Sequence, residues 1–439
     1  MTVDEQTLID FITGQRWFGS KTRHVTHATL IDRAVLRETD PALELQIVET
    51  RFDTGTHETY QLLADGGLDA LGDPRQVREL VHMIRSGAKL PAGEGVVEFG
   101  SVAGFAGLGQ ELREARAIDG EQSNTSIVFD EELILKVFRR LEAGINPELE
   151  LLRFLTEHQF ENIAQLAGWY VYAGRPMDAT LGILQRFVPN GRDGWEFALD
   201  AMSDGTSGFL QRLHRLGEVT GTMHTLLGSD TSDPHFAPEE PSSESLGLLT
   251  ATIDDEIESI FVELPDDNDD VSPIRGRGEE VRERLRLWSQ VGGIGRVIRH
   301  HGDFHLGQTL WADDDWVILD FEGEPARSLP ERRRKRSPLR DVAGMLRSFA
   351  YAASATPLLR GAEPPPGWEA QARTEFLAGY RSTVDPNLVP SGASMDKLLA
   401  VFELEKAVYE LRYELNNRPD WVRIPVAGIV RMLEEEVPV

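Results

Sequence analysis

Alternating hydrophobic and polar residues predict two antiparallel strands near the start of the chain. The two strands and the turn between them fall at residues 43–47, 59–63 and 53–56. A helical pattern over residues 75–86 closes this unit, and the Gly- and Pro-containing segment 91–95 indicates a boundary. We therefore expect residues 1–92 to form a small β-rich N-terminal cap subdomain.

A second sheet-forming region follows the cap. Its expected strands are residues 126–129, 133–138 and 181–188. The first two flank Asp130-Glu131, which predicts a β-hairpin, and a helix should begin after it with Asn146 as N-cap and Pro147 at the first position. The third strand ends at Pro189-Asn190-Gly191. These elements, the hairpin among them, predict an intermediate α and β lobe over residues 93–189.

Helical spacing dominates the remainder of the chain. Hydrophobic residues recur every three or four positions in two segments, at Phe209, Leu213, Leu216, Met223 and Leu227 and at Val281, Leu285 and Trp288. One short strand pair, residues 297–298 with 316–319, interrupts the helices, and the three prolines at 364–366 break them again. Residues 190–439 are therefore predicted to form a mostly helical lobe, and the whole chain an α+β fold.

Composition excludes several classes of protein. The 439 residues include no cysteine, which rules out disulfide frameworks, thiolate metal sites and cysteine nucleophiles. The formal net charge of −28 disfavours binding to nucleic acid or to an anionic membrane surface. No run of about 18 apolar residues occurs, and the acidic start lacks the basic region of a signal peptide. We expect a soluble, cytoplasmic protein that binds neither nucleic acid nor membranes.

The charge is unevenly distributed. Residues 216–274 contain fifteen carboxylates and no lysine or arginine. Their spacing matches no EF-hand loop, so a solvated helix and loop are favoured over a calcium or partner site. The opposite bias occurs at residues 332–336, Arg-Arg-Arg-Lys-Arg, which would suggest a nucleic-acid patch if the surrounding charge were not so negative.

Candidate chemistry concentrates in residues 300–308, His-His-Gly-Asp-Phe-His-Leu-Gly-Gln. In one interpretation His301, Asp303 and His305 bind zinc, as in a metal-dependent hydrolase. In a second, Asp303 orients a substrate hydroxyl and Gln308 offers an amide oxygen to Mg²⁺, which is the Asp-to-Asn spacing of a kinase catalytic loop with Gln in place of Asn. In a third, the histidines only hydrogen-bond within a loop.

Two further elements favour phosphoryl transfer. Asp320 ends a hydrophobic strand seventeen residues after Asp303, where a carboxylate can hold Mg²⁺, and Phe321 and Gly323 follow it. Lys136 is one of only six lysines and lies inside a hydrophobic strand, so a buried side chain there would need a partner. Glu148 on the following helix is the natural candidate, with Glu150 as the alternative. Such a pair places an ammonium against nucleotide phosphates.

The segment that should cover the phosphates departs from the protein-kinase pattern, because no G-x-G-x-x-G precedes Lys136. The sequence EQSNTS occupies residues 121–126 instead. Hydroxyl and backbone N–H groups of this segment are candidates for binding phosphate oxygens. The candidate residues are Ser123, Asn124, Thr125 and Ser126.

With these residues in place, the chain resembles the actinobacterial maltokinases, relatives of the aminoglycoside phosphotransferases within the eukaryotic-like kinase superfamily. The resemblance extends over nearly the whole chain. It depends on GQRWFGSK at 14–21, EQSNTS at 121–126, NPE at 146–148, DGW at 193–195, HGDFHLGQ at 301–308, DFEGEP at 320–325, ERRR at 331–334, SPLRDVAGMLRSF at 337–349, YE at 409–410 and 413–414, and RPDW at 418–421.

The resemblance implies a bilobal kinase fold with an N-terminal cap. It also implies ATP- and Mg²⁺-dependent phosphorylation of maltose at the anomeric hydroxyl, which would feed α-glucan synthesis, with trehalose synthase as a possible partner that supplies the maltose. Asp303 would be the base, Gln308 and Asp320 the Mg²⁺ ligands, and Lys136 with Glu148 the group that positions the phosphates. The hinge beside adenine would be Gln185, Arg186, Phe187 and Val188.

Sugar recognition usually combines aromatic faces with carboxylates, amides or cations that match hydroxyl groups. The candidates of these types are His305, Glu322, Arg340, Trp195, Tyr409, Tyr413 and Glu414. Three alternatives to a maltokinase remain open. These are a kinase for another sugar such as glucosamine, a metal-dependent hydrolase, and a binding module that keeps the fold without catalysis.

Overall fold

The computed structural model of the chain describes residues 4–103, 105, 112–118, 124–205, 208–242 and 244–434. The chain folds into two compact units. We call them the N-terminal unit (Met1–Asn190 and Arg327–Leu329) and the C-terminal unit (Gly191–Ala326 and Pro330–Val439). The boundary after residue 190 lies beside the division expected after residue 189.

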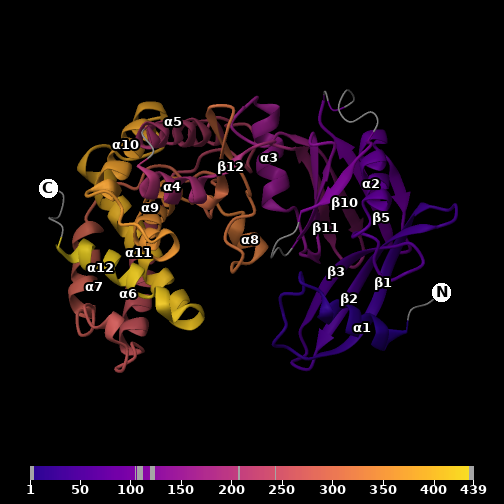
Figure 1. Cartoon of the computed structure of the whole chain (residues 1–439), viewed down its shortest axis with the longest axis horizontal. Helices are drawn as coiled ribbons and strands as arrows, with labels where there is room; N and C mark the ends of the chain where they lie inside the picture. The colour runs from indigo at the N-terminus through magenta and orange to yellow at the C-terminus, as the bar shows by residue number, and fades with distance from the viewer. Residues whose placement is uncertain are drawn as a thin grey trace. The chain divides into compact units, whose positions relative to one another are not determined.

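A four-stranded antiparallel sheet in the order β1-β2-β3-β9 begins the N-terminal unit (Figure 1). Its strands are β1 (Val25–Arg37), β2 (Leu43–Phe52), β3 (His57–Ala64) and β9 (Arg140–Leu141). Helix α1 (Glu5–Gly14) contacts β1. Both strands predicted from the alternating pattern are therefore present, and Gly55 in the turn between them has a φ of 80°, which glycine adopts without strain.

A seven-stranded sheet completes the N-terminal unit, in the order β4-β5-β10-β11-β8-β7-β6. The strands are β4 (Lys89–Pro91), β5 (Gly95–Ser101), β6 (Ala115–Ala117), β7 (Asn124–Phe129), β8 (Leu133–Phe138), β10 (Leu166–Gly174) and β11 (Asp178–Arg186). Helix α2 (Pro74–Ser86) contacts β5 and β10 (Figure 1). The predicted hairpin is formed by β7 and β8, with Asp130 and Glu131 at positive φ in its turn.

No boundary between compact units occurs at residue 92. The segment 91–95 is the turn between β4 and β5, where the Ala92 N–H donates to the Gly95 carbonyl. One hydrophobic cluster contains Leu43 and Leu45 of β2 together with Leu135 of β8. Residues on both sides of position 92 share this cluster, whereas a second cluster, which includes Ile12, Phe18 and Tyr60, lies wholly within residues 1–92.

Helices form most of the C-terminal unit. They are α4 (Gly194–Asp204), α5 (Phe209–Leu227), α6 (Ser245–Val262), α7 (Gly278–Trp288), α9 (Leu339–Arg360), α10 (Trp368–Thr383), α11 (Ala393–Asn417) and α12 (Arg423–Glu434), and the short α8 (Leu329–Arg332) begins at the end of the Arg327–Leu329 segment. The expected break at the three prolines falls between α9 and α10. The mostly helical character predicted for this part is confirmed.

The small sheet of this unit differs from the predicted strand pair. It consists of β12 (Arg192–Asp193), β13 (Thr309–Ala312) and β14 (Asp315–Ile318), and β14 pairs with β13. Val297 instead bridges to Glu239, and Ile298 bridges to Arg336. The pairing of residues 297–298 with 316–319 was therefore wrong. A two-residue turn at Asp313 and Asp314, both with positive φ, makes the neighbouring β13 the nearer partner.

Helices α5 and α10 approach each other unusually closely because glycines line their contact. A Cβ atom added to Gly217 would overlap the Phe376 carbonyl oxygen, and one added to Gly379 would overlap the His214 carbonyl oxygen. These obstacles are backbone atoms, which cannot move aside as the end of a flexible side chain can.

We therefore expect Gly379→Ala to lower the free energy of unfolding by about 1–3 kcal/mol, the usual cost of overpacking. The result would be measured as a lower melting temperature. Gly247→Ala in α6 is the matched control, because no atom lies within 4 Å of its added Cβ. The control should be neutral or slightly stabilising, since alanine favours helices over glycine. Equal melting temperatures for Gly379→Ala and wild type would contradict the proposed close contact.

The acidic stretch and the basic run both have structural explanations. None of the fifteen carboxylates between residues 216 and 274 is buried, as expected for a solvated helix and loop. Asp254 is bound by Arg282 of α7, with Oδ2 and Nη2 2.6 Å apart. In the basic run, Lys335 Nζ donates to the carbonyl oxygens of Pro234 and Ala237 and pairs with Glu239.

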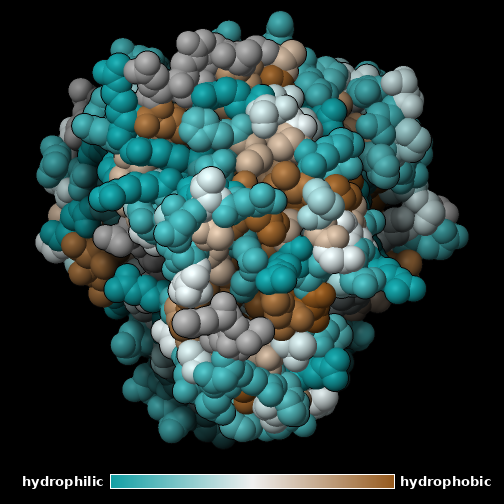
Figure 2. Space-filling model, turned by 90° about the vertical axis from the view of Figure 1, so that its right-hand side faces the viewer, coloured by the Kyte–Doolittle hydropathy of each residue, from teal (hydrophilic) through white to brown (hydrophobic). Residues whose placement is uncertain are grey.

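The surface visible in Figure 2 is mostly hydrophilic, and hydrophobic residues occur on it in small groups. No helix among the described residues has the length and apolar character that crossing a membrane requires.

Candidate functional site

The N-terminal unit forms the ion pair expected for Lys136. Lys136 lies in β8, and its Nζ is 2.7 Å from Oε2 of Glu148 in α3 (Pro147–Glu157). The two side chains are 14% and 2% exposed. Asn146 caps α3 by accepting a hydrogen bond from the Glu148 N–H at 2.8 Å, which fixes the position of Glu148. A buried carboxylate thus holds the lysine in place.

The residues expected to cover the phosphates belong to a strand where the structure describes them. Asn124, Thr125 and Ser126 start β7, while Ser123 lies outside the described residues. The Thr125 hydroxyl accepts a hydrogen bond from Arg139 Nε at 2.7 Å. Ser126 is buried and lies opposite Lys136 in the sheet register. Their role in phosphate binding therefore stays a prediction.

The expected hinge begins with the last two residues of strand β11, Gln185 and Arg186, and β11 is adjacent to β8. Ile183 lies opposite Lys136 and Gln185 opposite Ile134, so the hinge and the lysine are on neighbouring strands of one sheet. Gln185 is buried, and the Phe187 N–H donates to the Glu132 carbonyl at 2.8 Å. Of the other two hinge candidates, Arg186 is exposed and Val188 is half-buried. Their proximity to adenine also stays a prediction.

In the C-terminal unit, a buried aspartate holds the backbone of the loop that carries Asp303. Asp341, in the first turn of α9, accepts hydrogen bonds from the N–H groups of His301 at 2.8 Å and Gly302 at 2.9 Å. His224 of α5 lies 3.1 Å from the same carboxylate. Burial alone would raise the pKa of Asp341, but the neighbouring His300 and the contact with His224 outweigh it and lower that pKa well below its ordinary value. Asp341 therefore acts as an anionic anchor for the loop.

His301 joins this loop to the end of β14. Its Nε2 lies 2.8 Å from the Leu319 carbonyl oxygen, and its Nδ1 is 3.3 Å from the Asp303 N–H. In this arrangement the ring donates from Nε2 and accepts at Nδ1. Because both nitrogens are engaged, His301 has none left for a metal ion.

The candidate Mg²⁺ ligands Gln308 and Asp320 lie close together in space, one after the loop of Asp303 and the other directly after Leu319. Gln308 Nε2 is 3.4 Å from Asp320 Oδ2, and an oxygen of Glu322 lies within 4.8 Å of an oxygen of Asp320. Rotation of the Gln308 amide by 180° would present its oxygen in place of its nitrogen. Carboxylate and amide oxygens suit Mg²⁺, so Gln308, Asp320 and Glu322 form a donor set that fits this ion.

Backbone strain and close approach mark the same place. Asp320 has a φ of 57°, in the left-handed region that residues other than glycine rarely adopt. A Cβ on Gly302 would lie 3.3 Å from the Cα of Gly323, and both glycines have positive φ. Because both positions are glycine, the loop that carries Asp303 can contact the loop that follows Asp320. This contact is a physical reason for glycine at position 302, before Asp303, and at position 323, after Asp320.

The zinc interpretation does not fit the histidine geometry. Among the described residues, His301, Asp303 and His305 do not place three ligand atoms within 4.8 Å of one another. His305 accepts a hydrogen bond from the Gly307 N–H at its Nδ1, where it caps the short helix η3 (Leu306–Gln308). Burial lowers the pKa of His305, so this ring stays neutral. The loop histidines position backbone groups instead.

The sugar candidates separate into structural and accessible residues. Arg340 pairs with Glu405 at 2.9 Å, and the buried Glu414 accepts hydrogen bonds from Tyr351 and Arg418, so both link helices. Tyr409 and Tyr413 on α11 are 37% and 44% exposed. Trp195 at the start of α4 is half-buried. The exposed aromatic faces of α11 are therefore the better candidates for contacting a sugar.

Sequence reasoning missed a lysine beside Asp303. Lys406 of α11 places its Nζ 3.4 Å from Oδ1 of Asp303 and 5.1 Å from the centre of the Tyr409 ring. The signal in the sequence is its rarity, since Lys406 is one of only six lysines. Asp341 was also missed, although its sequence segment was recognised as part of the resemblance.

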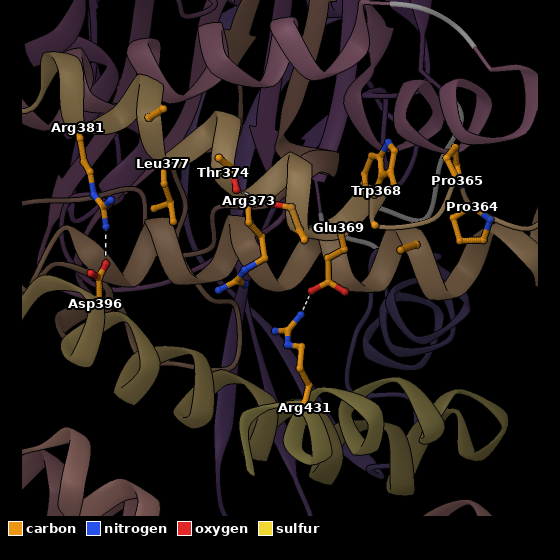
Figure 3. A pocket seen from close by; sticks show the side chains of 14 residues that line it. Pro364, Pro365, Trp368, Glu369, Arg373, Thr374, Leu377, Arg381, Asp396 and Arg431 are labelled. Carbon is orange, nitrogen blue, oxygen red and sulfur yellow. Dashed lines mark hydrogen bonds and ion pairs between the residues drawn. The ribbon is translucent and has the colours of Figure 1, made fainter. Parts of the chain in front are cut away.

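A separate cavity of about 730 Å³ lies in the C-terminal unit beside the start of α10 (Figure 3). Figure 3 shows two ion pairs at its edge, Arg381 with Asp396 and Arg431 with Glu369. None of the candidate residues from the sequence lines it. Its cations are held by carboxylates of neighbouring helices, so its polar groups stabilise the helical packing.

Comparisons with known proteins agree with this geometry. A family model described as "Phosphotransferase enzyme family" matches residues 114–370, and one described as "Maltokinase N-terminal cap domain" matches residues 11–70. A glucosamine kinase of Mycolicibacterium smegmatis is 25% identical over 365 residues, which cover 78% of this chain and 85% of the relative. A glucosamine kinase of Streptacidiphilus jiangxiensis is 26% identical over 446 residues, which cover 91% of this chain and 97% of the relative.

Solved structures support the same fold. A structure titled glucosamine kinase, crystal form B, has a TM-score of 0.75 at 20% identity and covers 97% of this chain and 99% of its own. A structure of a glucosamine kinase in complex with glucosamine, ADP and inorganic phosphate has a TM-score of 0.74 at 20% identity. It covers 99% of this chain and 100% of its own. The predicted fold class, an aminoglycoside phosphotransferase-like kinase with an N-terminal cap, is confirmed.

Proposed function

Because the chain belongs to the phosphotransferase enzyme family, we propose that it is an ATP-dependent sugar kinase that converts maltose to maltose 1-phosphate. The observation that carries this proposal is the anchored loop of the C-terminal unit. Asp341 and His301 hold Asp303 in place, and Gln308 and Asp320 lie together immediately after it. An oriented base next to oxygen ligands is what phosphoryl transfer requires of a protein.

Each residue then has a specific task. Asp303 accepts the proton of the attacking sugar hydroxyl, which makes the oxygen a better nucleophile toward the γ-phosphate. Lys136, held by Glu148, contacts the nucleotide phosphates, and residues 185–188 contact adenine. Gln308 and Asp320 would hold Mg²⁺, with Glu322 as a third donor. When bound, that ion neutralises phosphate charge. Both the lysine pair and the aspartate loop are needed in such a reaction.

Maltose is favoured as acceptor by the cap. The model of the maltokinase N-terminal cap matches residues 11–70, and we propose residues 1–92 as a cap subdomain on the lobe of residues 93–189. In this proposal the product feeds α-glucan synthesis and trehalose synthase supplies the maltose. The alternative acceptor is glucosamine, because two curated relatives that match most of this chain are named glucosamine kinases.

The experiment that tests the proposal is ATP consumption with a panel of acceptors: maltose, glucose and glucosamine. Maltose should support the highest kcat/KM, and its product should lose the reducing end, because the anomeric hydroxyl is blocked by phosphate. A preference for glucosamine would select the alternative acceptor. Binding of ATP and Mg²⁺ without transfer to any sugar would contradict the proposal and support a binding module.

A further inference from the structure

A cation lies directly beside the proposed catalytic base. Lys406 Nζ is 3.4 Å from Asp303 Oδ1, and the side chains of Lys406 and Asp303 are 33% and 23% exposed. The lysine is therefore neither deeply enclosed nor freely solvated. Any hydroxyl that approaches Asp303 within hydrogen-bond distance, about 3 Å, also comes close to this ammonium group.

The lysine remains charged in this position. Burial works to lower the pKa of Lys406, but the carboxylates of Asp303, Glu410 and Glu324 outweigh burial and raise it. Glu410 is committed to another cation, because it accepts hydrogen bonds from the buried Arg347 at 2.7 Å and 3.0 Å. Asp303, the group that must also receive the substrate, is the carboxylate with which Lys406 forms an ion pair.

We propose that Lys406 determines acceptor specificity, by favouring sugars that are uncharged next to the reacting hydroxyl and rejecting sugars that carry an ammonium group there. A neutral hydroxyl can accept a hydrogen bond from Lys406 while another donates to Asp303. In a sugar phosphorylated at the anomeric hydroxyl, the C2 substituent is on the adjacent carbon. An ammonium at C2 would meet a like charge in a partly desolvated site, where repulsion is strong.

This inference rests on the proposed function and makes it more specific. The relatives with extensive coverage are named glucosamine kinases, and their substrate is an aminosugar. For this chain, the position of Lys406 beside Asp303 is the physical reason to expect a neutral acceptor. The inference predicts that neutral sugars, maltose among them, are better acceptors than glucosamine.

The test compares glucose with glucosamine, which differ only at C2, in the wild type and two variants. Lys406→Met removes the charge and keeps the length, whereas Lys406→Arg keeps the charge. Wild type should have a higher kcat/KM for glucose, and the ratio of glucose to glucosamine should fall at least tenfold in Lys406→Met. In Lys406→Arg, the ratio of glucose to glucosamine should stay within about threefold of the wild-type ratio. Damage to the fold as a whole would lower kcat/KM for both sugars and leave their ratio unchanged.

Equilibrium binding of both sugars, measured by calorimetry, tests the inference independently of turnover. If the wild type binds glucose in preference to glucosamine but transfers phosphate to neither, the proposed function fails and the inference stands. If the wild type prefers glucosamine, or binds neither sugar, the inference is overturned. An unchanged ratio in Lys406→Met overturns it as well, even when maltose is phosphorylated.

Discussion

Asp303→Asn is expected to lower kcat with ATP and a sugar acceptor by about a thousandfold, within the usual range for loss of a general base. The amide has nearly the same shape as the carboxylate, but it cannot accept the proton of the attacking hydroxyl. The backbone of the loop should be unaffected, because the anchoring bonds from Asp341 and His301 involve main-chain groups of residues 301–303. Steady-state turnover measures the loss.

ATP binding provides the internal control for this prediction. Lys136, Glu148 and the hinge are unaltered, so the dissociation constant for ATP with Mg²⁺ should stay within a few-fold of the wild type. Asp255→Asn is a matched substitution at an exposed position of α6 and should leave turnover unchanged. Wild-type turnover in Asp303→Asn would show that another group accepts the proton, and the mechanism proposed for this loop would be wrong.

Features that depend on neighbouring residues could be predicted from the sequence. The hairpin around Asp130 and Glu131, the cap of α3 at Asn146 and the pair of Lys136 with Glu148 all involve residues within twelve positions of one another. Turn, capping and burial preferences act over such short distances. The kinase spacing of Asp303, Gln308 and Asp320 spans seventeen positions, and it was sufficient to indicate phosphoryl transfer.

Features that depend on distant contacts could not be predicted in this way. Lys406 reaches Asp303 across 103 positions, and Asp341 reaches the loop across about forty. Nothing in the local pattern distinguishes these residues from solvated ones, because their partners are set by how the helices pack. The same limit explains the core shared across residue 92.

Asp341→Ala is expected to lower the free energy of unfolding by about 3 kcal/mol or more and to reduce turnover. The substitution removes a fully buried carboxylate and leaves the His301 and Gly302 N–H groups and the His224 ring without their acceptor. Each buried donor left unpaired costs about 1–3 kcal/mol. Asp303 does not touch Asp341, but its loop loses the bonds that hold it, so kcat should fall while ATP binding persists.

Lowering the pH should reduce the difference in melting temperature between Asp341→Ala and the wild type. Because the pKa of Asp341 is lowered in the folded protein, its stabilising contribution is complete above the ordinary Asp pKa of about 3.9. That contribution is lost as the pH falls toward the lowered value, when the carboxylate gains a proton. Melting temperatures of the wild type and Asp341→Ala, measured from neutral to acidic pH, should therefore converge. Asp255→Ala, at an exposed helical position, should show no such trend. If the melting temperatures of the wild type and Asp341→Ala differ by the same amount from neutral to acidic pH, the negative charge of Asp341 does not contribute to its anchoring of the loop.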